Sequence, residues 1–83
     1  MKAIDRLLKL DGEKLEIFKI LDGSVTAIQY ADCNVEDGSC IVGTFGRGAT
    51  VDEAAEDYCN KISGKTLVFR FYKTTQKEVT VLF

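Results

Sequence analysis

The sequence predicts an α+β domain, with a mostly antiparallel five-stranded sheet that carries its helices on one face. Three observations favour this class: apolar runs end at Asp-Gly pairs, one helix starts at a capping box, and strand-type runs flank that helix. The expected order is α-β-β-β-α-β-β, and the short connections make neighbouring strands antiparallel. We expect residues 1–83 to form a single domain.

The first half of the chain contains one predicted helix and three predicted strands. Residues 3–9 place apolar side chains at helical spacing. Apolar runs at 15–21 and 25–30 are separated by Asp22-Gly23, a pair favoured in hairpin turns because glycine tolerates positive φ. A third strand is expected at 40–45, after a second Asp-Gly pair.

The second helix is expected at 51–62. Thr50 and Glu53 form a Thr-x-x-Glu capping box at its start, and Ser63-Gly64 supplies its end. Strands rich in Val, Phe and Tyr are predicted at 66–72 and 78–83. The side chains that form the apolar stripe of the helix are Val51, Ala54, Ala55, Tyr58, Cys59 and Ile62.

The composition argues against several classes of protein. The net charge is −2 and the isoelectric point about 5.0, which argues against general nucleic-acid binding. No run approaches the roughly 18 apolar residues of a membrane span, and the start of the chain lacks the apolar core of a signal peptide. We therefore expect a cytoplasmic protein with reduced thiols; a disulfide between Cys33 and Cys40 stays open.

Most catalytic chemistry is missing from the sequence. Histidine is absent, which removes the commonest general base and metal ligand. No G-x-S-x-G or C-x-x-C motif occurs, and the cysteine spacing matches no zinc site. We expect no catalytic residue, no metal and no cofactor, and hence no enzyme.

A glycine-rich turn at 43–50 leads into the second helix. It lacks the P-loop pattern, but glycines before a helix N-terminus can bind an anion through free N–H groups, with Arg47 assisting. The commoner reading is that these glycines let the chain bend into the cap. A small-ligand or nucleotide-binding module is therefore one alternative function.

Charged residues suggest two binding surfaces. An acidic set is expected to be solvated or to dock a protein partner; its members are Glu36, Asp37, Asp52, Glu53, Glu56 and Asp57. A basic set with an aromatic is expected to protect an edge strand or to bind single-stranded nucleic acid; its members are Lys65, Arg70, Tyr72, Lys73 and Lys77.

The stretch 46–58 resembles the G-x-T-x-E-E-A segment of HicB-type antitoxins, which implies a partial RNase H-like arrangement of helix and sheet. The chain is also similar to small uncharacterised proteins of phages and prophages, in which such a segment leads to a run matched here by Ile-Ser-Gly-Lys-Thr-Leu-Val-Phe at 62–69. These resemblances imply a phage-type origin and transfer no catalytic residue.

The leading hypothesis is a small cytoplasmic phage-type protein that binds another protein without catalysis, for example as an inhibitor of a host or defence protein. A nucleic-acid-binding accessory protein that uses residues 65–77 is the second. Edge strands are open to β-augmentation. The last strand, ending at Phe83, is a candidate for pairing with a copy of itself, which leaves a homodimer open.

Overall fold

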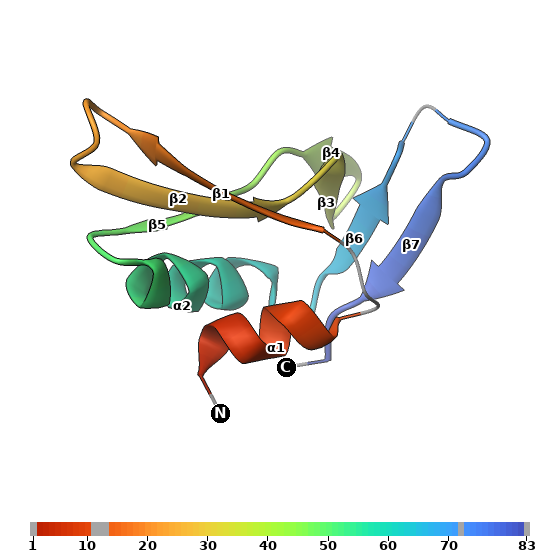
Figure 1. Ribbon diagram of the computed structural model, residues 1–83. Coiled ribbons are helices and arrows are strands. Elements are labelled where there is room, and N and C mark those ends of the chain that lie inside the picture. Colours follow the sequence, from red (N-terminus) through yellow and green to blue (C-terminus); the bar gives the residue numbers. More distant parts are fainter. Residues whose placement is uncertain (1, 11–13, 72, 83) are drawn as a thin grey trace.

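In residues 2–10, 14–71 and 73–82, which the computed structural model describes, the chain forms two helices that pack against antiparallel strands (Figure 1). Every strand pairing is antiparallel, which confirms the predicted α+β class and the order of the predicted elements. The elements are α1 (Ala3–Lys9), β1 (Leu15–Ile20), β2 (Val25–Tyr30), β3 (Cys33–Asp37), β4 (Cys40–Val42), β5 (Gly46–Gly48), α2 (Val51–Ile62), β6 (Thr66–Phe69) and β7 (Lys77–Thr80).

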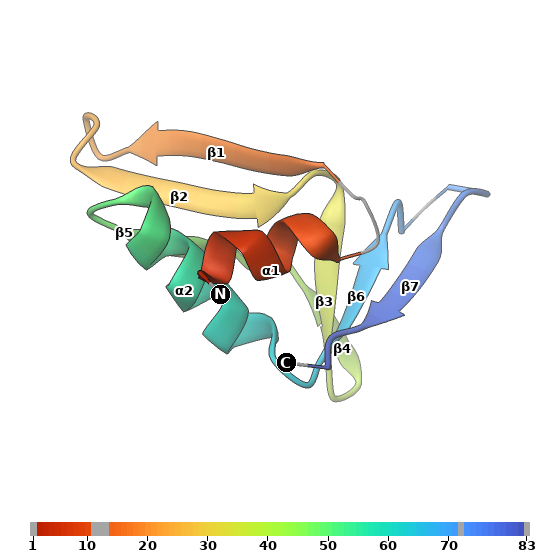
Figure 2. The ribbon, with the colours of Figure 1, turned by 60° about the horizontal axis from the view of Figure 1, so that its bottom comes forward.

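The strands form two sheets within the described residues. The first sheet has the order β1-β2-β5, and the second has the order β4-β3-β6-β7. Figure 2 shows the helices below the first sheet, with the second sheet running steeply across one end of it. This arrangement encloses the core between the helices and the two sheets.

The predicted single sheet is wrong, because the described strands form two sheets, and the predicted strand 40–45 ends at Val42, before the chain crosses from one sheet to the other. Its first part is β4, in which Val42 pairs with Val35 of β3. The chain then crosses to the first sheet, where Gly46 of β5 pairs with Ile28 of β2. The residues between β4 and β5 include Gly43, which lacks the side chain that would hold a strand in a packed sheet.

The strand β3 was not among the predicted elements. Its sequence, Cys-Asn-Val-Glu-Asp, is rich in residue types that are depleted in strands. It forms because it is paired on both sides, with Val35 opposite Val42 on one side and Leu67 on the other. Tertiary pairing therefore overrides local propensity at this position.

The last two strands are shorter than predicted. The predicted strand 66–72 ends at Phe69, because Arg70 has a φ of 55°, which a strand cannot accommodate. The predicted strand 78–83 corresponds to β7, which begins at Lys77. Tyr72 and Phe83 lie outside the described residues.

Both ends of α2 follow the sequence prediction. The Glu53 N–H donates to the Thr50 hydroxyl at 3.2 Å, as predicted, but the Glu53 carboxylate accepts the N–H of Ala49, at 2.9 Å, in place of the N–H of Thr50. Gly64 beyond the last turn has a φ of 74°, as a helix-ending glycine requires. Every residue of the predicted stripe except Val51 is buried. Neither helix of the described residues is long and apolar enough to cross a membrane.

The helix α2 lies unusually close to β5. A Cβ built on Gly46 would lie 2.5 Å from the backbone nitrogen of Tyr58 and would also overlap the carbonyl oxygen of Ala54. A Cβ on Gly48 would lie 2.5 Å from the Cβ of Glu53. The two glycines therefore serve helix packing, in addition to the bend that the sequence predicts.

Replacing Gly46 with alanine should destabilise the fold by about 2 kcal/mol or more, because helix backbone must move to admit the methyl group. Gly43→Ala is the matched control: its Cβ would meet only the Asn34 side chain, at 3.9 Å, and should change stability by less than about 0.5 kcal/mol. Urea denaturation of both variants measures the difference. Equal effects of the two substitutions would contradict the packing argument.

Candidate protein-binding surface

The first sheet has one face toward the helices and one face toward solvent. Side chains alternate along a strand, and directly opposite residues of antiparallel strands share a face. Ile28 and Tyr30 belong to the core, so their opposite residues in the register also point to the helix side. The residues that alternate with these along β1, β2 and β5 point to the solvent side. They form what we call the outer face: Glu16, Phe18, Ile20, Val25, Ala27, Gln29 and Arg47.

The outer face is apolar at its centre, and neither described helix lies over it (Figure 2). Phe18 is 39% exposed, and Ile20 and Val25 are half-buried. Ala27 lies between Phe18 and Arg47 in the register and is fully buried, as expected for a small side chain flanked by two large ones. The outer face thus presents an aromatic and a guanidinium, side-chain types that are enriched at protein interfaces.

The outer face ends at the β1–β2 turn, whose tip is apolar and strained. Leu21 has a φ of 51° and is 68% exposed, and the following Asp22 has a φ of 57°. The Ser24 hydroxyl donates to the Leu21 carbonyl at 2.7 Å and holds this conformation. A large apolar side chain in a left-handed conformation, presented to solvent, is a feature typical of binding sites.

The acidic residues of α2 are largely engaged within the chain. Asp57 accepts the N–H of Arg47 at 3.0 Å and pairs with Lys61 at 2.8 Å. Glu53 caps the helix, as described above. Asp52 forms an exposed ion pair with Lys2 at 3.8 Å. Two of the four predicted carboxylates on α2 therefore hold backbone groups at or before the start of the helix.

Glu36 and Asp37, the other predicted acidic residues, are the last two residues of β3, just before the turn into β4. Asp37 pairs with Lys65, which follows the C-terminal end of α2, at 3.4 Å. Asp52 and Glu53 occupy the first turn of the same helix. The structure thus spreads the predicted acidic residues over both ends of α2 and, with Glu56 and Asp57, its middle, and does not gather them into one patch.

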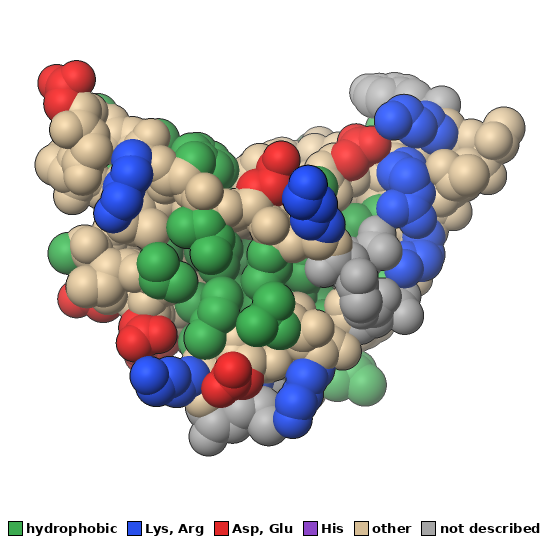
Figure 3. All heavy atoms as spheres, viewed as in Figure 1, with side chains coloured by type: hydrophobic (Ala, Val, Ile, Leu, Met, Phe, Trp, Pro, Cys, Tyr) green, Lys and Arg blue, Asp and Glu red, His purple; other side chains and the backbone are tan. Residues whose placement is uncertain are grey.

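The predicted basic residues run along the second sheet. Figure 3 shows Lys and Arg side chains in a row over the β6–β7 hairpin, with acidic side chains beside them. Lys73 pairs with Asp32 at 3.2 Å, and Lys77 lies over the Phe69 ring, 5.6 Å from its centroid. The Arg70 Nε donates to the Thr75 carbonyl at 2.9 Å. The row is therefore partly neutralised, and Tyr72 lies outside the described residues.

The glycine turn binds carboxylates of its own chain. The N–H groups of Arg47 and Ala49, which an external anion would use, donate to Asp57 and Glu53. A shallow pocket of about 300 Å³ remains beside the turn, lined by Phe45, Arg47 and Lys61 among others. The Lys61 amine donates to the Phe45 carbonyl at 3.1 Å and pairs with Asp57, so its charge is already compensated.

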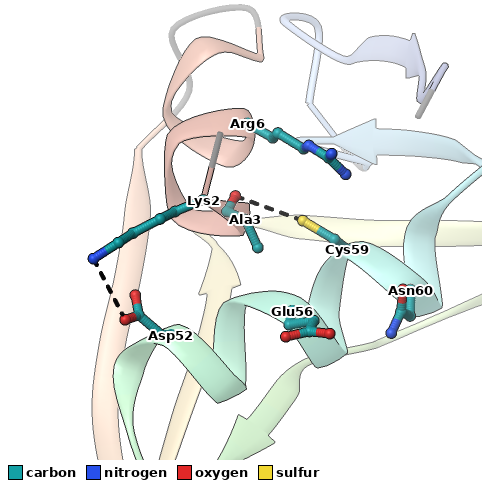
Figure 4. Close-up of a pocket in the computed structure, with 7 residues that line it drawn as sticks. All are labelled: Lys2, Ala3, Arg6, Asp52, Glu56, Cys59 and Asn60. Atoms are coloured by element: carbon teal, nitrogen blue, oxygen red, sulfur yellow. Dashed lines mark hydrogen bonds and ion pairs between the residues drawn. The ribbon is translucent and has the colours of Figure 1, made fainter.

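A second cleft, of about 380 Å³, lies between α1 and α2 (Figure 4). Arg6 lies on its α1 side and Glu56 on its α2 side, and the Cys59 thiol points to the Ala3 carbonyl at 3.6 Å. No buried side-chain nitrogen or oxygen of the described residues lacks a hydrogen-bond partner. The cleft thus has charged rims but no orphaned polar group, and we assign no ligand to it.

The three cysteines do not meet. Cys33 lies opposite Phe69 and Cys40 opposite Asp37, and neither these two cysteines nor the buried Cys59 forms a disulfide. Among the described residues, no three Cys, Asp or Glu side chains are grouped closely enough to hold a metal ion. The structure thus offers no disulfide between Cys33 and Cys40.

Comparisons of the chain with protein families, with curated proteins and with solved structures found no match. The resemblance to HicB-type and phage proteins therefore stays an expectation.

The pKa of Asp57 lies below its ordinary value. Burial of the carboxylate acts to raise the pKa, but hydrogen bonds from Lys61 and the Arg47 N–H, together with the charges of these two side chains, lower it by more. A lowered folded-state pKa contributes stability above the unfolded-state value of about 4. That contribution is lost as the pH falls through the folded-state pKa.

Asp57→Ala should therefore lower the free energy of unfolding at pH 7, by about 1 kcal/mol after allowance for its partial exposure to solvent. The deficit should shrink between about pH 5 and pH 2. Glu56→Ala is the control, because it makes a similar helix substitution one residue away without a backbone partner among the described residues. Denaturant titrations across this pH range check both; a deficit that is constant with pH would refute the assignment.

Proposed function

We propose that this protein is a non-catalytic protein-binding module and that the outer face of the first sheet is its binding surface. The single observation that carries the proposal is the uncovered apolar centre around Phe18, which continues to the exposed Leu21 at the hairpin tip. An apolar surface of this kind gains free energy when a partner removes it from water.

Polar side chains at the rim of the outer face would make binding specific for one partner. Arg47 offers a planar donor for a carboxylate or carbonyl of the partner. At the opposite edge, Gln29 donates to Glu16 at 3.4 Å, so these groups are held in place before binding. The expected partner surface is therefore apolar at its centre, with an acceptor group placed to meet Arg47.

The resemblance to phage proteins extends this proposal. In that form, a small cytoplasmic phage-type protein inhibits a host or defence protein by covering part of its surface. The second candidate function is nucleic-acid binding, which the row of basic side chains over β6 and β7 favours. Nuclease treatment distinguishes it from protein binding.

The test is an affinity pull-down of the tagged protein from bacterial lysate, with and without nuclease. Phe18→Ser should reduce recovery of the protein partner at least about tenfold, since aromatic anchors carry much of the energy of an interface. Ile41→Ser is the matched control, because Ile41 of β4 is 40% exposed, close to the 39% of Phe18, but lies on the second sheet. Its recovery should match that of the unaltered protein.

Two results would overturn the proposal. One is equal recovery of the partner by the Phe18→Ser and unaltered proteins. The other is loss of every partner after nuclease treatment, which would favour the nucleic-acid function of residues 65–77 instead.

A further inference from the structure

The described residues leave four strands at the edges of the sheets, and β1 differs from the other three. The strands β4 and β5 have three residues each, and β7 has four and carries both Lys77 and Glu78. The strand β1 also carries two charged residues, Glu16 and Lys19, but it has six residues in all, and the other four are Leu, Ile or Phe. Long apolar edges are the ones that pair with another chain, and natural proteins keep most edges short or charged.

The hydrogen bonds of β1 show which of its backbone groups face outward. The Ala31 N–H donates to the Lys14 carbonyl at 2.8 Å, so Lys14 is a hydrogen-bonded residue of the β1–β2 ladder. Because this role alternates along a strand, Leu15, Ile17 and Lys19 direct their N–H and C=O groups away from β2. These three residues form what we call the free edge.

Apolar side chains lie directly beside the free edge, on the helix side. Ile17, which shares the helix side with its register partner Ile28, is 50% exposed. Leu15, which is half-buried, lies opposite Tyr30, and the Tyr30 hydroxyl donates to the carbonyl of Leu7 in α1. Figure 3 shows hydrophobic side chains gathered on this face where β1 passes over α1. The edge therefore offers apolar surface together with unpaired backbone groups.

We propose that a second copy of this chain pairs antiparallel with β1 along the free edge. A twofold axis perpendicular to the sheet at Ile17 places Ile17 opposite Ile17 of the second copy and Leu15 opposite Lys19. All three residues of the free edge then exchange hydrogen bonds, and no charged residue faces a like charge directly. In this pairing, the aliphatic part of Lys19 of one copy covers Leu15 of the other. The Lys19 amine donates to the Thr26 hydroxyl of its own chain at 2.7 Å.

Neighbouring registers are less favourable. An axis at Glu16 sets two carboxylates directly opposite one another, which is destabilising. An axis at Phe18 sets Leu15 opposite Leu21, which cannot extend the ladder because its φ is 51°. The geometry thus selects Ile17 as the centre of a closed dimer, and β1 replaces the last strand as the edge that self-pairs.

The register can be tested with single cysteines in a Cys40→Ser background, which removes the exposed native thiol. Opposite hydrogen-bonded residues have Cα atoms about 5.5 Å apart, within disulfide range. Ile17→Cys should therefore form a cross-linked dimer on mild oxidation. Lys19→Cys alone should not, because four residues of offset separate the two copies by about 13 Å.

A mixture supplies the most specific test. Leu15→Cys mixed with Lys19→Cys should give a cross-linked heterodimer, although neither variant cross-links by itself. Light scattering of the unaltered chain should give twice the 9.2 kDa mass, and Ile17→Lys should raise the dissociation constant at least tenfold while circular dichroism stays unchanged.

A monomeric mass at 100 µM, or equal cross-linking of the Ile17→Cys and Lys19→Cys chains, would overturn the inference. So would a monomer whose partner capture is lost in Ile17→Lys, since the edge would then receive a strand from another protein. The inference does not rest on the proposed function, because Phe18→Ser leaves every residue of the free edge in place.

Discussion

The packing of the helices on the sheets depends on the hydrogen bond that the backbone N–H of Tyr30 makes at the end of β2. This N–H points to the β5 side, but pairing with β5 ends at Ile28 opposite Gly46. The hydroxyl of Tyr58 on α2 takes the missing place and accepts this N–H at 3.2 Å. The Tyr30 ring then meets the Phe69 ring of β6, with centroids 5.6 Å apart, and its own hydroxyl donates to Leu7 in α1. Burial raises the pKa of both tyrosines, although the hydrogen bond from the Tyr30 N–H acts to lower that of Tyr58, and the Tyr30 hydroxyl stays protonated as its bond to Leu7 requires. One residue thus joins both sheets and both helices.

This arrangement explains why one side of the first sheet is uncovered. The contacts of Tyr30 and the close approach of α2 to Gly46 hold both helices on the same side. A chain of 83 residues buries a smaller share of its surface than a larger domain does, and here its two described helices are committed to one core. Because both described helices pack on the same side, Phe18 on the outer face and the edge of β1 stay exposed.

Local signals in the sequence were sufficient for the parts of the fold that depend on neighbouring residues. The capping box of Thr50, the turn at Asp22-Gly23 and the helical stripe ending at Ile62 each require only a few residues, and the structure confirms them. The strand β3 and the end of the predicted strand 40–45 at Val42 depend on partners far along the chain, which no local pattern encodes. The outer face could not be predicted without the register of β1 with β2. Ile17 and Phe18 point to opposite faces, and only the register shows which of them shares the face of the core. The role of Asp57 was hidden for the same reason, since it binds a backbone N–H of β5 ten residues away.

Edge pairing and face binding reinforce each other through symmetry. Antiparallel strands can be related by a twofold axis only if the axis is perpendicular to the sheet, because opposite residues must share a face. The pairing proposed for β1 therefore turns the outer faces of both copies to the same side of one continuous sheet. Phe18 of one copy then lies opposite Glu16 of the other, close to the axis. A partner that presents two copies of its own site meets the second outer face at high effective concentration once it has bound the first. Self-pairing thus leaves the proposed binding surface open and doubles it.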